Sequence, residues 1–381
     1  MKLRIAVTAD PYLPVPPRLY GGIERVIALL VAGLVQRGHD VTLIAHPQSQ
    51  TPAALIGYGA PPHTGARRRL RELWQVGATL ATLADRVDII HSFGRLAALT
   101  PVLPLRRVKK VQSYQRAIPW RGVRDAARVA GDSILFTGCS TSLYEPVVSQ
   151  AMVGRLKPAP TTIDRLKPAA TANAPLIPFA TLAGRTRWRT VYNCVNTSAY
   201  TATTTIATDA PLVFLGRIER IKGAHAAIAI ARGAERRLII AGNVTDSEYF
   251  RSEIAPHIDN RMVTYVGQVD DAQKKQLLGR SAALLMPIEW NEPFGIVMAE
   301  AFACGTPVIG FDRGSVPEVV REEVNGFLVR DIQEAIRATN RLHSIDRTAV
   351  RRDCEERFSC DAVVHAYEDI YREALGTCDD C

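Results

Sequence analysis

Two carboxylates eight residues apart, Glu292 and Glu300, lie on either side of a segment that predicts the start of a helix. A proline directly after the first carboxylate suits a first helical turn. The backbone N–H groups of Gly295, Ile296 and Val297 would open this helix without partners, and such a terminus attracts phosphate. A phosphate between two carboxylates is compatible with them only when they face hydroxyl groups. A sugar nucleotide offers that arrangement, with ribose hydroxyls, a diphosphate and a hexose in a row.

A second charged pair, Arg217 and Lys222, follows a short apolar run that predicts a strand. Guanidinium is a fork of donors and ammonium is a point charge, so the pair suits two phosphate groups. The alternative is a pair of solvated surface charges. Glycines stand at the ends of this strand and of the next two, at Gly216, Gly242 and Gly267, where the backbone can approach a nucleotide closely.

The elements that would position these residues alternate between strand and helix. Residues 282–286 predict a buried strand, 294–304 a helix and 307–309 the next strand. The loop that carries Glu292 therefore lies at the carboxyl end of a strand, where ligands of open α/β sheets bind. The same alternation predicts strands at 237–241 and 263–266, and helices near 246–257, 271–280, 331–343 and 347–357.

The beginning of the chain predicts a similar unit. Residues 3–9 form a near-continuous apolar strand, a proline-rich loop follows, and Gly21 and Gly22 precede a helix that ends at Gly38. A strand over 41–45 completes the β–α–β unit. Glycines at a helix start permit close approach of a ligand, and the helix end favours anions. The alternative for the glycine pair is a simple tight turn.

Three stretches of this sequence resemble the family 4 glycosyltransferases: EPFGIVMAEAFACGTPVIGFDRGSVPEVV, the NGFLV after it, and YGGIERVIALLVAGLVQRGHDVTLIA. The resemblance covers nearly the whole chain and is strongest over 211–330. It implies the α/β GT-B fold, two doubly wound Rossmann-like domains that face each other across a cleft, and transfer with retention of anomeric configuration. The implied domains are 1–197, on the acceptor side, and 198–359, which binds the sugar nucleotide, with a helix near 360–376 returning to the first domain.

The family resemblance also implies roles for single residues. Glu292 would contact the donor sugar, Glu300 the nucleotide ribose, and Arg217 and Lys222 the diphosphate. The expected catalytic residues are Glu292, Arg217, Lys222 and His91. The expected donor-binding residues are Gly21, Gly22, Gly216, Gly242, Gly267, Phe294, Gly295, Ile296, Val297 and Glu300.

His91 closes a predicted strand over 87–91. The family often places a D-x-x-H at this strand end, facing the cleft, and Asp88 and His91 fit that pattern. The alternative is a hydrogen-bonded histidine at a strand edge. Many members carry a histidine just past the next strand, where this chain has residues 111–115, VQSYQ. Either His91 compensates for that departure or the donor-sugar contact differs in kind.

Bulk properties constrain the environment of the protein. The 381 residues suit two or three domains, and no segment approaches the ~18 apolar residues that span a bilayer. Seven scattered cysteines without a secretory signal predict reduced thiols in a cytoplasm. Residues 151–189 contain RLKPA twice and several prolines, so we expect a basic insertion there.

The positive charge is concentrated in the first domain. Against a net charge of +9 for the chain, residues 65–195 carry 21 Lys/Arg and seven Asp/Glu, a surplus of 14. Such asymmetry predicts an anionic partner. Three interpretations stay open: peripheral docking on an anionic membrane to reach a lipid-linked acceptor, binding of an anionic glycan acceptor, or solvated charge. We expect no nucleic-acid partner.

The predicted reaction transfers a sugar from a nucleoside-diphosphate sugar, with UDP or GDP as nucleotide, to an acceptor hydroxyl. The charge on the departing diphosphate grows in the transition state. Arg217, Lys222 and the helix start at Gly295 would stabilise it, and the cleft motifs contain no Asp-x-Asp, so we expect neither a metal ion nor a cofactor. The alternatives are a sugar-nucleotide hydrolase or epimerase on the same fold, and a basic polyanion-binding module with a non-catalytic donor site.

Overall fold

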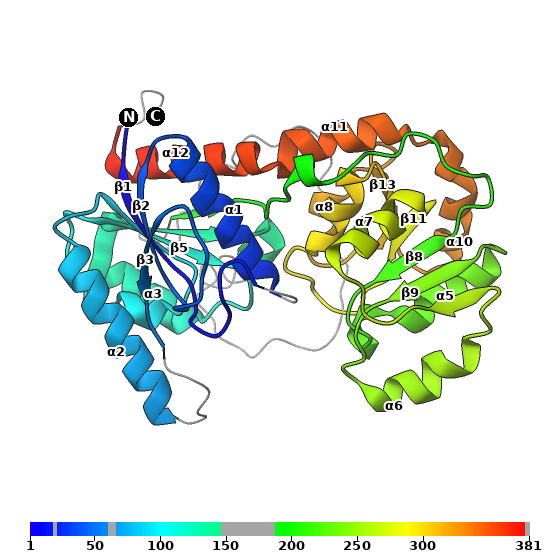
Figure 1. The fold of residues 1–381 in the computed structure, drawn as a ribbon, viewed down its shortest axis with the longest axis horizontal. Helices are drawn as coiled ribbons and strands as arrows, with labels where there is room; N and C mark the ends of the chain where they lie inside the picture. Colours follow the sequence, from blue (N-terminus) through cyan, green and yellow to red (C-terminus); the bar gives the residue numbers. More distant parts are fainter. Residues whose placement is uncertain (18–20, 60–65, 146–186, 378–381) are drawn as a thin grey trace.

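The computed structural model describes residues 1–17, 21–59, 66–145 and 187–377. These residues form two α/β domains that stand side by side in Figure 1. Each domain has one parallel sheet with helices on both faces, which confirms the predicted fold class. No helix among the described residues is long and apolar enough to cross a bilayer.

The sheet of the N-terminal domain has the strand order β3-β2-β1-β4-β5-β6-β7. Its strands are β1 (Arg4–Thr8), β2 (Asp40–Ala45), β3 (Ala54–Gly57), β4 (Ile89–Ser92), β5 (Lys109–Tyr114), β6 (Ile134–Gly138) and β7 (Trp188–Thr190). Every adjacent pair is parallel. The strand order reverses between β1 and β4, and the crevice at such a reversal is where doubly wound sheets bind ligands.

Helices cover both faces of this sheet. They are α1 (Gly22–Gln36), α2 (Ala66–Leu83) and α3 (Trp120–Ala130), together with the 3-10 turns η1 (Leu96–Leu99) and η2 (Gly131–Ser133). The buried face of α1 carries Val26, Ile27, Leu30, Val31 and Leu34, at the helical spacing that the sequence predicts.

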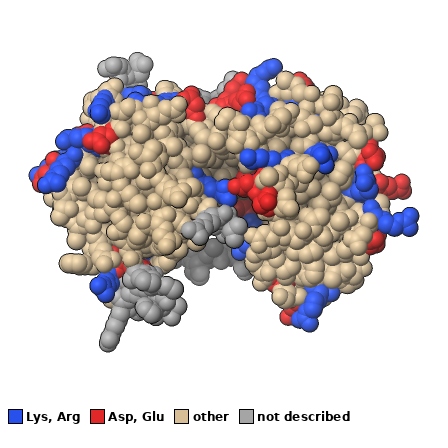
Figure 2. Space-filling view, viewed as in Figure 1, with Lys and Arg blue, Asp and Glu red and all other residues tan. Residues whose placement is uncertain are grey.

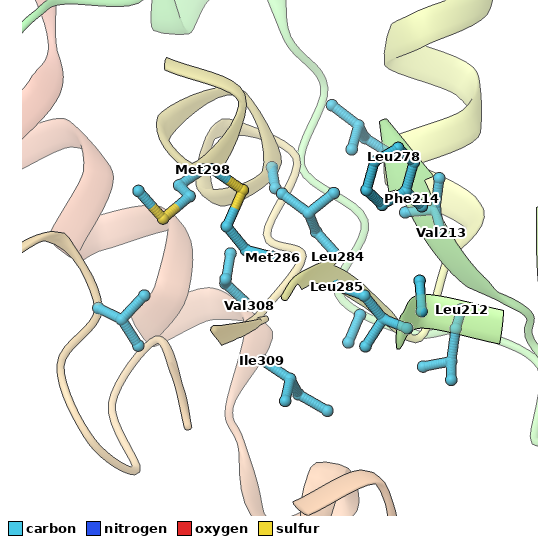
Figure 3. Close-up of a cluster of buried hydrophobic side chains, with 14 of the residues drawn as sticks. Leu212, Val213, Phe214, Leu278, Leu284, Leu285, Met286, Met298, Val308 and Ile309 are labelled. Atoms are coloured by element: carbon cyan, nitrogen blue, oxygen red, sulfur yellow. The ribbon is translucent and has the colours of Figure 1, made fainter. Parts of the chain in front are cut away.

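The C-terminal domain repeats the plan with the order β10-β9-β8-β11-β12-β13. Its strands are β8 (Leu212–Leu215), β9 (Leu238–Ala241), β10 (Val263–Tyr265), β11 (Ala283–Met286), β12 (Val308–Phe311) and β13 (Gly326–Val329). The central strands are continuous apolar runs because both of their faces are covered. Figure 3 shows side chains of β8, β11 and β12 packed with Leu278 and Met298 from the covering helices. The order reverses between β8 and β11, so the loops after these two strands meet.

The helical elements of the second domain begin with the turns η3 (Thr197–Ala199) and η4 (Arg220–Lys222). They continue with α5 (Ala224–Gly233), α6 (Ser247–Tyr249), η5 (Phe250–Ile254), η6 (Ala255–His257), α7 (Asp271–Arg280), α8 (Ile296–Ala303), α9 (Val316–Val319), α10 (Ile332–Arg341), η7 (Leu342–Ser344) and α11 (Arg347–Phe358). The helix predicted near 246–257 is instead a chain of short α, π and 3-10 turns, because Pro256 interrupts the hydrogen-bond ladder.

Two segments of the chain connect the domains and lie beside each other. The Val195 N–H donates to the Phe358 carbonyl at 2.8 Å, and Val195 forms a parallel bridge with Ser359. Helix α12 (Cys360–Leu375) then runs back along the N-terminal domain, where Tyr367 and Tyr371 are fully buried beside α1 (Figure 1).

Two parts of the N-terminal domain differ from the sequence-based expectation. Strand β7 (Trp188–Thr190) lies within the predicted insertion, so the last residues of that insertion belong to the sheet. Residues 151–186 of that insertion lie outside the described residues. The sequence of strand β5, KKVQSY, is mostly polar, so its pattern did not indicate a buried strand. Lys110 is nevertheless buried, and its ammonium donates to the carbonyls of Leu105 at 2.6 Å and Val102 at 3.3 Å.

Candidate active site

The carboxyl edges of the two sheets face a hollow between the domains. Figure 2 shows this hollow, with basic and acidic side chains gathered inside it. The domains touch across it through Arg25 on α1, whose guanidinium lies 2.8 Å from the Asp271 carboxylate on α7. Glu318 makes a second contact, because its carboxylate accepts the N–H groups of Thr141 and Ser142, both at 2.7 Å.

The loop between β11 and α8 forms one wall of the site. Gly295 has a φ of 69° and caps α8, and a Cβ at this position would lie 2.9 Å from the Met286 and Met298 methyl groups. Only glycine therefore fits this turn. Helix α8 begins one residue later, so the N–H groups of Ile296 and Val297 lack acceptors within the helix. Phe294 is buried beneath them and contacts the domain core, so it supports the turn.

Glu292 meets Lys222 at the point where the strand order reverses. Glu292 follows β11 and Lys222 follows β8, and their side chains form an ion pair that is mostly shielded from solvent. The Trp290 indole N–H donates to the same carboxylate at 3.0 Å, and the Lys222 ammonium lies 4.7 Å from the centre of the Trp290 ring. The structure therefore brings together the carboxylate that was predicted to meet the sugar and the cation that was predicted to meet the diphosphate, which are 70 residues apart in sequence.

Glu300 has a separate set of partners. It is nearly buried on α8, pairs with the Lys274 ammonium of α7, and accepts the Tyr200 hydroxyl at 3.0 Å. A capping box, in which the Asp270 carboxylate accepts the Gln273 N–H at 2.8 Å, fixes the start of α7 and thereby the place of Lys274. Burial raises the pKa of Tyr200 far above its ordinary value, so the hydroxyl stays a donor.

Sequence analysis did not identify Lys274, Tyr200 or Trp290. Trp290 lies two residues from Glu292, and this position in the loop was the only feature of the sequence that could have indicated its contact with the carboxylate. Lys274 and Tyr200 lie on α7 and in the linker, and only the packing of these elements against α8 brings them to Glu300.

Arg217 and the three glycines lie at neighbouring strand ends. The Arg217 guanidinium is 2.8 Å from the Glu219 carboxylate, and about a third of its side chain is exposed, so a ligand can reach it. Gly242 has a φ of 145°, and a Cβ there would lie 1.7 Å from the Gly216 carbonyl oxygen. Its N–H donates to the Gly267 carbonyl at 2.8 Å. The backbones of these loops therefore lie in direct contact with one another, and their approach to a nucleotide stays a prediction.

The glycine pair of the N-terminal domain lies at the start of α1. Gly21 has a φ of 154° and caps the helix, and Gly22 is its first residue. A Cβ on Gly21 would meet Pro17 and the Glu24 carboxylate within 3 Å, whereas one on Gly22 would meet open space. Because Arg25 on the same turn pairs with Asp271, the start of α1 faces the C-terminal domain across the hollow.

The prediction that His91 faces the cleft is wrong. Its side chain is fully buried against α12, with Nδ1 2.6 Å from the Tyr371 hydroxyl and Nε2 2.7 Å from the Ser113 hydroxyl. Burial lowers the pKa of His91 to about 3, so the imidazole is neutral at physiological pH. Asp88 lies at the other end of the strand and pairs with Arg4 at 2.7 Å. His91 is therefore a core residue in this conformation, and a substrate cannot reach it.

No group of three or more His, Cys, Asp or Glu side chains that could hold a metal ion occurs in the described part of the chain. The carboxylates of the hollow are instead each paired with an ammonium or a guanidinium, and Lys274 is shared between Glu300 and Asp271. Such an arrangement can bind an anionic ligand by exchange of partners, because each cation can turn from its carboxylate to a phosphate.

Comparisons with known proteins agree with this geometry. Residues 202–356 match the family "Glycosyl transferases group 1", and residues 20–134 match "Glycosyltransferase Family 4". The chain is 35% identical to the glycogen synthase of Mycobacterium tuberculosis over 370 residues, which cover 85% of this chain and 81% of that protein.

Two solved structures show the same fold along the whole chain. A glycosyltransferase involved in avilamycin A biosynthesis superposes with a TM-score of 0.67 at 24% identity and covers 99% of both chains. The Anabaena protein HepE, in complex with UDP-glucose, superposes with a TM-score of 0.66 at 17% identity and covers 99% of this chain and all of that one. With this fold, these family matches and the paired charges at the strand ends, the chain belongs to the group 1 glycosyltransferases of family 4 and is a glycosyltransferase with the GT-B fold.

Proposed function

We propose that this glycosyltransferase takes its sugar from a nucleoside-diphosphate sugar, with UDP or GDP as nucleotide, and transfers it to an acceptor hydroxyl. The observation that carries the proposal is the Glu292–Lys222 ion pair beside the open N–H groups of α8. A diphosphate at this helix start would gain the N–H groups and Lys222 together. HepE, which has a similar fold, binds UDP-glucose.

In this arrangement the donor lies along α8. The ribose hydroxyls donate to Glu300, which Lys274 and Tyr200 hold in place. The sugar lies against Glu292, which Trp290 orients. As the glycosidic bond to the diphosphate breaks, negative charge grows on the leaving oxygens. Lys222, Arg217 and the start of α8 stabilise that charge, so the proposed reaction needs no metal ion.

The proposed reaction retains the anomeric configuration, and the support for this is the resemblance to the family. Nuclear magnetic resonance of the first product formed from an α-linked donor tests it, since retention gives an α-linked product. A product that is initially β-linked would refute this part of the proposal.

The test of the proposed function is a panel of UDP-, GDP- and ADP-sugars assayed for nucleoside-diphosphate release, with and without acceptors. We expect release that depends strongly on an acceptor hydroxyl. Release at the same rate without any acceptor would favour a hydrolase, and binding without release would favour a non-catalytic donor site.

We also propose that the N-terminal domain contacts an anionic membrane through α2. Leu70 and Trp74, one helical turn apart on this helix, have 67% and 73% of their surface exposed. Arg71 is exposed between them. Aromatic rings settle at the level of lipid headgroups, and basic side chains near an anionic bilayer contribute ~1 kcal/mol each.

A further inference from the structure

The N-terminal domain contains a cavity of about 750 Å³ that the donor site does not use. Its walls come from the segment after β4, the end of β5, helix α3 and the first turn of α1. This volume is in the range of pockets that enclose a drug-sized molecule. Ile23 of the lining lies two residues before Arg25, which contacts the C-terminal domain, so the cavity lies beside the hollow that holds the donor site.

The walls of this cavity are mainly apolar. Phe93, Leu96 and Leu103 form one side, and Val129 on α3 lines the other with 48% of its surface exposed. The carboxylate of the lining, Asp125, lies 3.5 Å from Arg124 and 3.6 Å from Arg128 on its own helix. Most of the surface that lines the cavity is therefore apolar, which suits an aliphatic chain better than a free sugar.

Two arginines of the lining add a positive charge to these apolar walls. The Arg116 guanidinium has 63% of its side chain exposed and lies 2.5 Å from the Asp10 carboxylate. The Arg95 guanidinium donates to the Tyr12 hydroxyl at 3.1 Å and has no carboxylate partner within the described residues. An anion that binds here would gain one unneutralised guanidinium and one that is accessible from solvent.

The polar groups at the end of β5 lack hydrogen-bond partners. Tyr114 lines the cavity and is 7% exposed, and its buried hydroxyl has no partner in the described structure. The Gln115 side-chain oxygen, on the next residue of the lining, is also buried without one. A buried polar group without a partner destabilises the protein unless a ligand supplies the hydrogen bond.

We propose that this cavity binds the acceptor as a lipid-like amphiphile. An aliphatic chain lies against the walls, a phosphate at its end meets Arg95 and Arg116, and the hydroxyl that receives the sugar points toward the donor. The inference rests on the proposed function for its reaction, but the binding it describes is measurable without turnover.

Three small probes separate the chain from the charge. Octyl phosphate has both, octyl β-glucoside has the chain without charge, and glucose 1-phosphate has the charge without the chain. Binding is measured by calorimetry below the critical micelle concentrations. We expect octyl phosphate to bind at least tenfold more tightly than either of the others. Glucose 1-phosphate that binds as tightly as octyl phosphate would overturn the proposal in favour of a free sugar phosphate.

Gly122→Leu fills the cavity. Gly122 lies on α3 in the lining, and a Cβ there would meet Leu96 at 3.6 Å, an ordinary contact, so the helix accepts a side chain. We expect this variant to weaken both octyl probes at least tenfold. Arg121→Leu, which adds the same side chain one residue away and outside the lining, is the matched control and should leave them unchanged. If both octyl probes bind to the Gly122→Leu variant as tightly as to the wild type, the aliphatic chain does not bind in this cavity and the proposal is wrong.

The double variant Arg95→Gln, Arg116→Gln tests the charge. It should abolish the preference for octyl phosphate over octyl β-glucoside, and a preference that persists would refute the role of the arginines. UDP binding, measured in parallel, should be the same in all variants. If the wild-type protein binds no nucleoside diphosphate, the proposed donor site fails, whatever the octyl probes show.

Discussion

Lys222→Ala is the most direct test of the donor site. This ammonium neutralises Glu292, which is 9% exposed and has one other side-chain partner among the described residues, the Trp290 indole. Removing Lys222 therefore has two effects on a diphosphate. The phosphate loses an ammonium donor, and it also approaches a carboxylate whose charge is no longer compensated.

The expected loss of binding energy follows from these two effects. A hydrogen bond to a charged group contributes ~1.5–3 kcal/mol. Because the ammonium must turn away from Glu292 to meet a phosphate, part of its attraction is already used in the free protein, which favours the lower end. The carboxylate that is left without its cation repels the phosphate, and this repulsion favours the upper end of the range. We expect the dissociation constant for UDP or GDP to rise about 10- to 150-fold, which corresponds to this range.

Calorimetric titration with UDP and GDP measures the change, and two further variants locate its cause. Arg220→Ala removes a cation from the same turn, but this arginine pairs with Glu253, so diphosphate affinity should stay unchanged. Adding Glu292→Gln to Lys222→Ala should recover part of the lost affinity, because the unpaired charge is gone. Wild-type affinity in a folded Lys222→Ala protein, or an equal loss in Arg220→Ala, would refute the assignment.

Four further predictions follow from the structure. Glu300→Ala should weaken nucleoside-diphosphate binding, whereas Glu292→Ala should spare it and lower turnover, since ribose is common to donor and product; calorimetry and kcat separate the two. Diphosphate release should continue in EDTA, and loss of activity that Mg²⁺ or Mn²⁺ restores would contradict our account of the leaving group. Because His91 has a pKa of about 3 in the folded protein and ~6.5 unfolded, its contribution to stability is complete above pH 6.5 and falls by up to ~1.4 kcal/mol per unit below it. Urea unfolding of His91→Gln should show a weaker loss in acid, with turnover per folded molecule retained. Wild-type protein should sediment with anionic vesicles at low salt and dissociate from them at high salt. The double variant Leu70→Ser, Trp74→Ser should stay in solution. If the wild type does not bind the vesicles at low salt, the proposed membrane contact is wrong.

Local signals were sufficient to predict the part of the site that lies between β11 and β12. An apolar run, a proline, a glycine and a second apolar run each restrict the backbone within a few residues, so the position of Glu292 in a loop before a helix follows from sequence alone. The helix itself begins at Ile296, two residues after the predicted start at 294, because Gly295 is its N-cap. The partners of Glu300 do not follow from sequence alone, because Tyr200 is 100 residues away and Lys274 is 26 away. Only tertiary packing decides which cation or hydroxyl reaches a given carboxylate.

His91 shows a different limit. A parallel strand between two helix layers is buried on both faces, so its apolar pattern does not indicate which side each residue faces. The family resemblance suggested the cleft, but α12 covers the face to which His91 points and contributes Tyr367 and Tyr371 to its surroundings. That helix lies about 270 residues further along the chain, where no local pattern at β4 can indicate it.

The paired charges of the donor site suggest how binding is connected to the contact between domains. Lys274 is shared between Glu300 and Asp271, whose oxygen lies 3.2 Å from its ammonium, and Asp271 also pairs with Arg25 of the N-terminal domain. We expect a ribose that takes over Glu300 to leave Lys274 more available to Asp271, and so to weaken the ion pair between Asp271 and Arg25. The α7 residues Asp271 and Lys274 therefore connect the predicted ribose site to one of the contacts between the two domains.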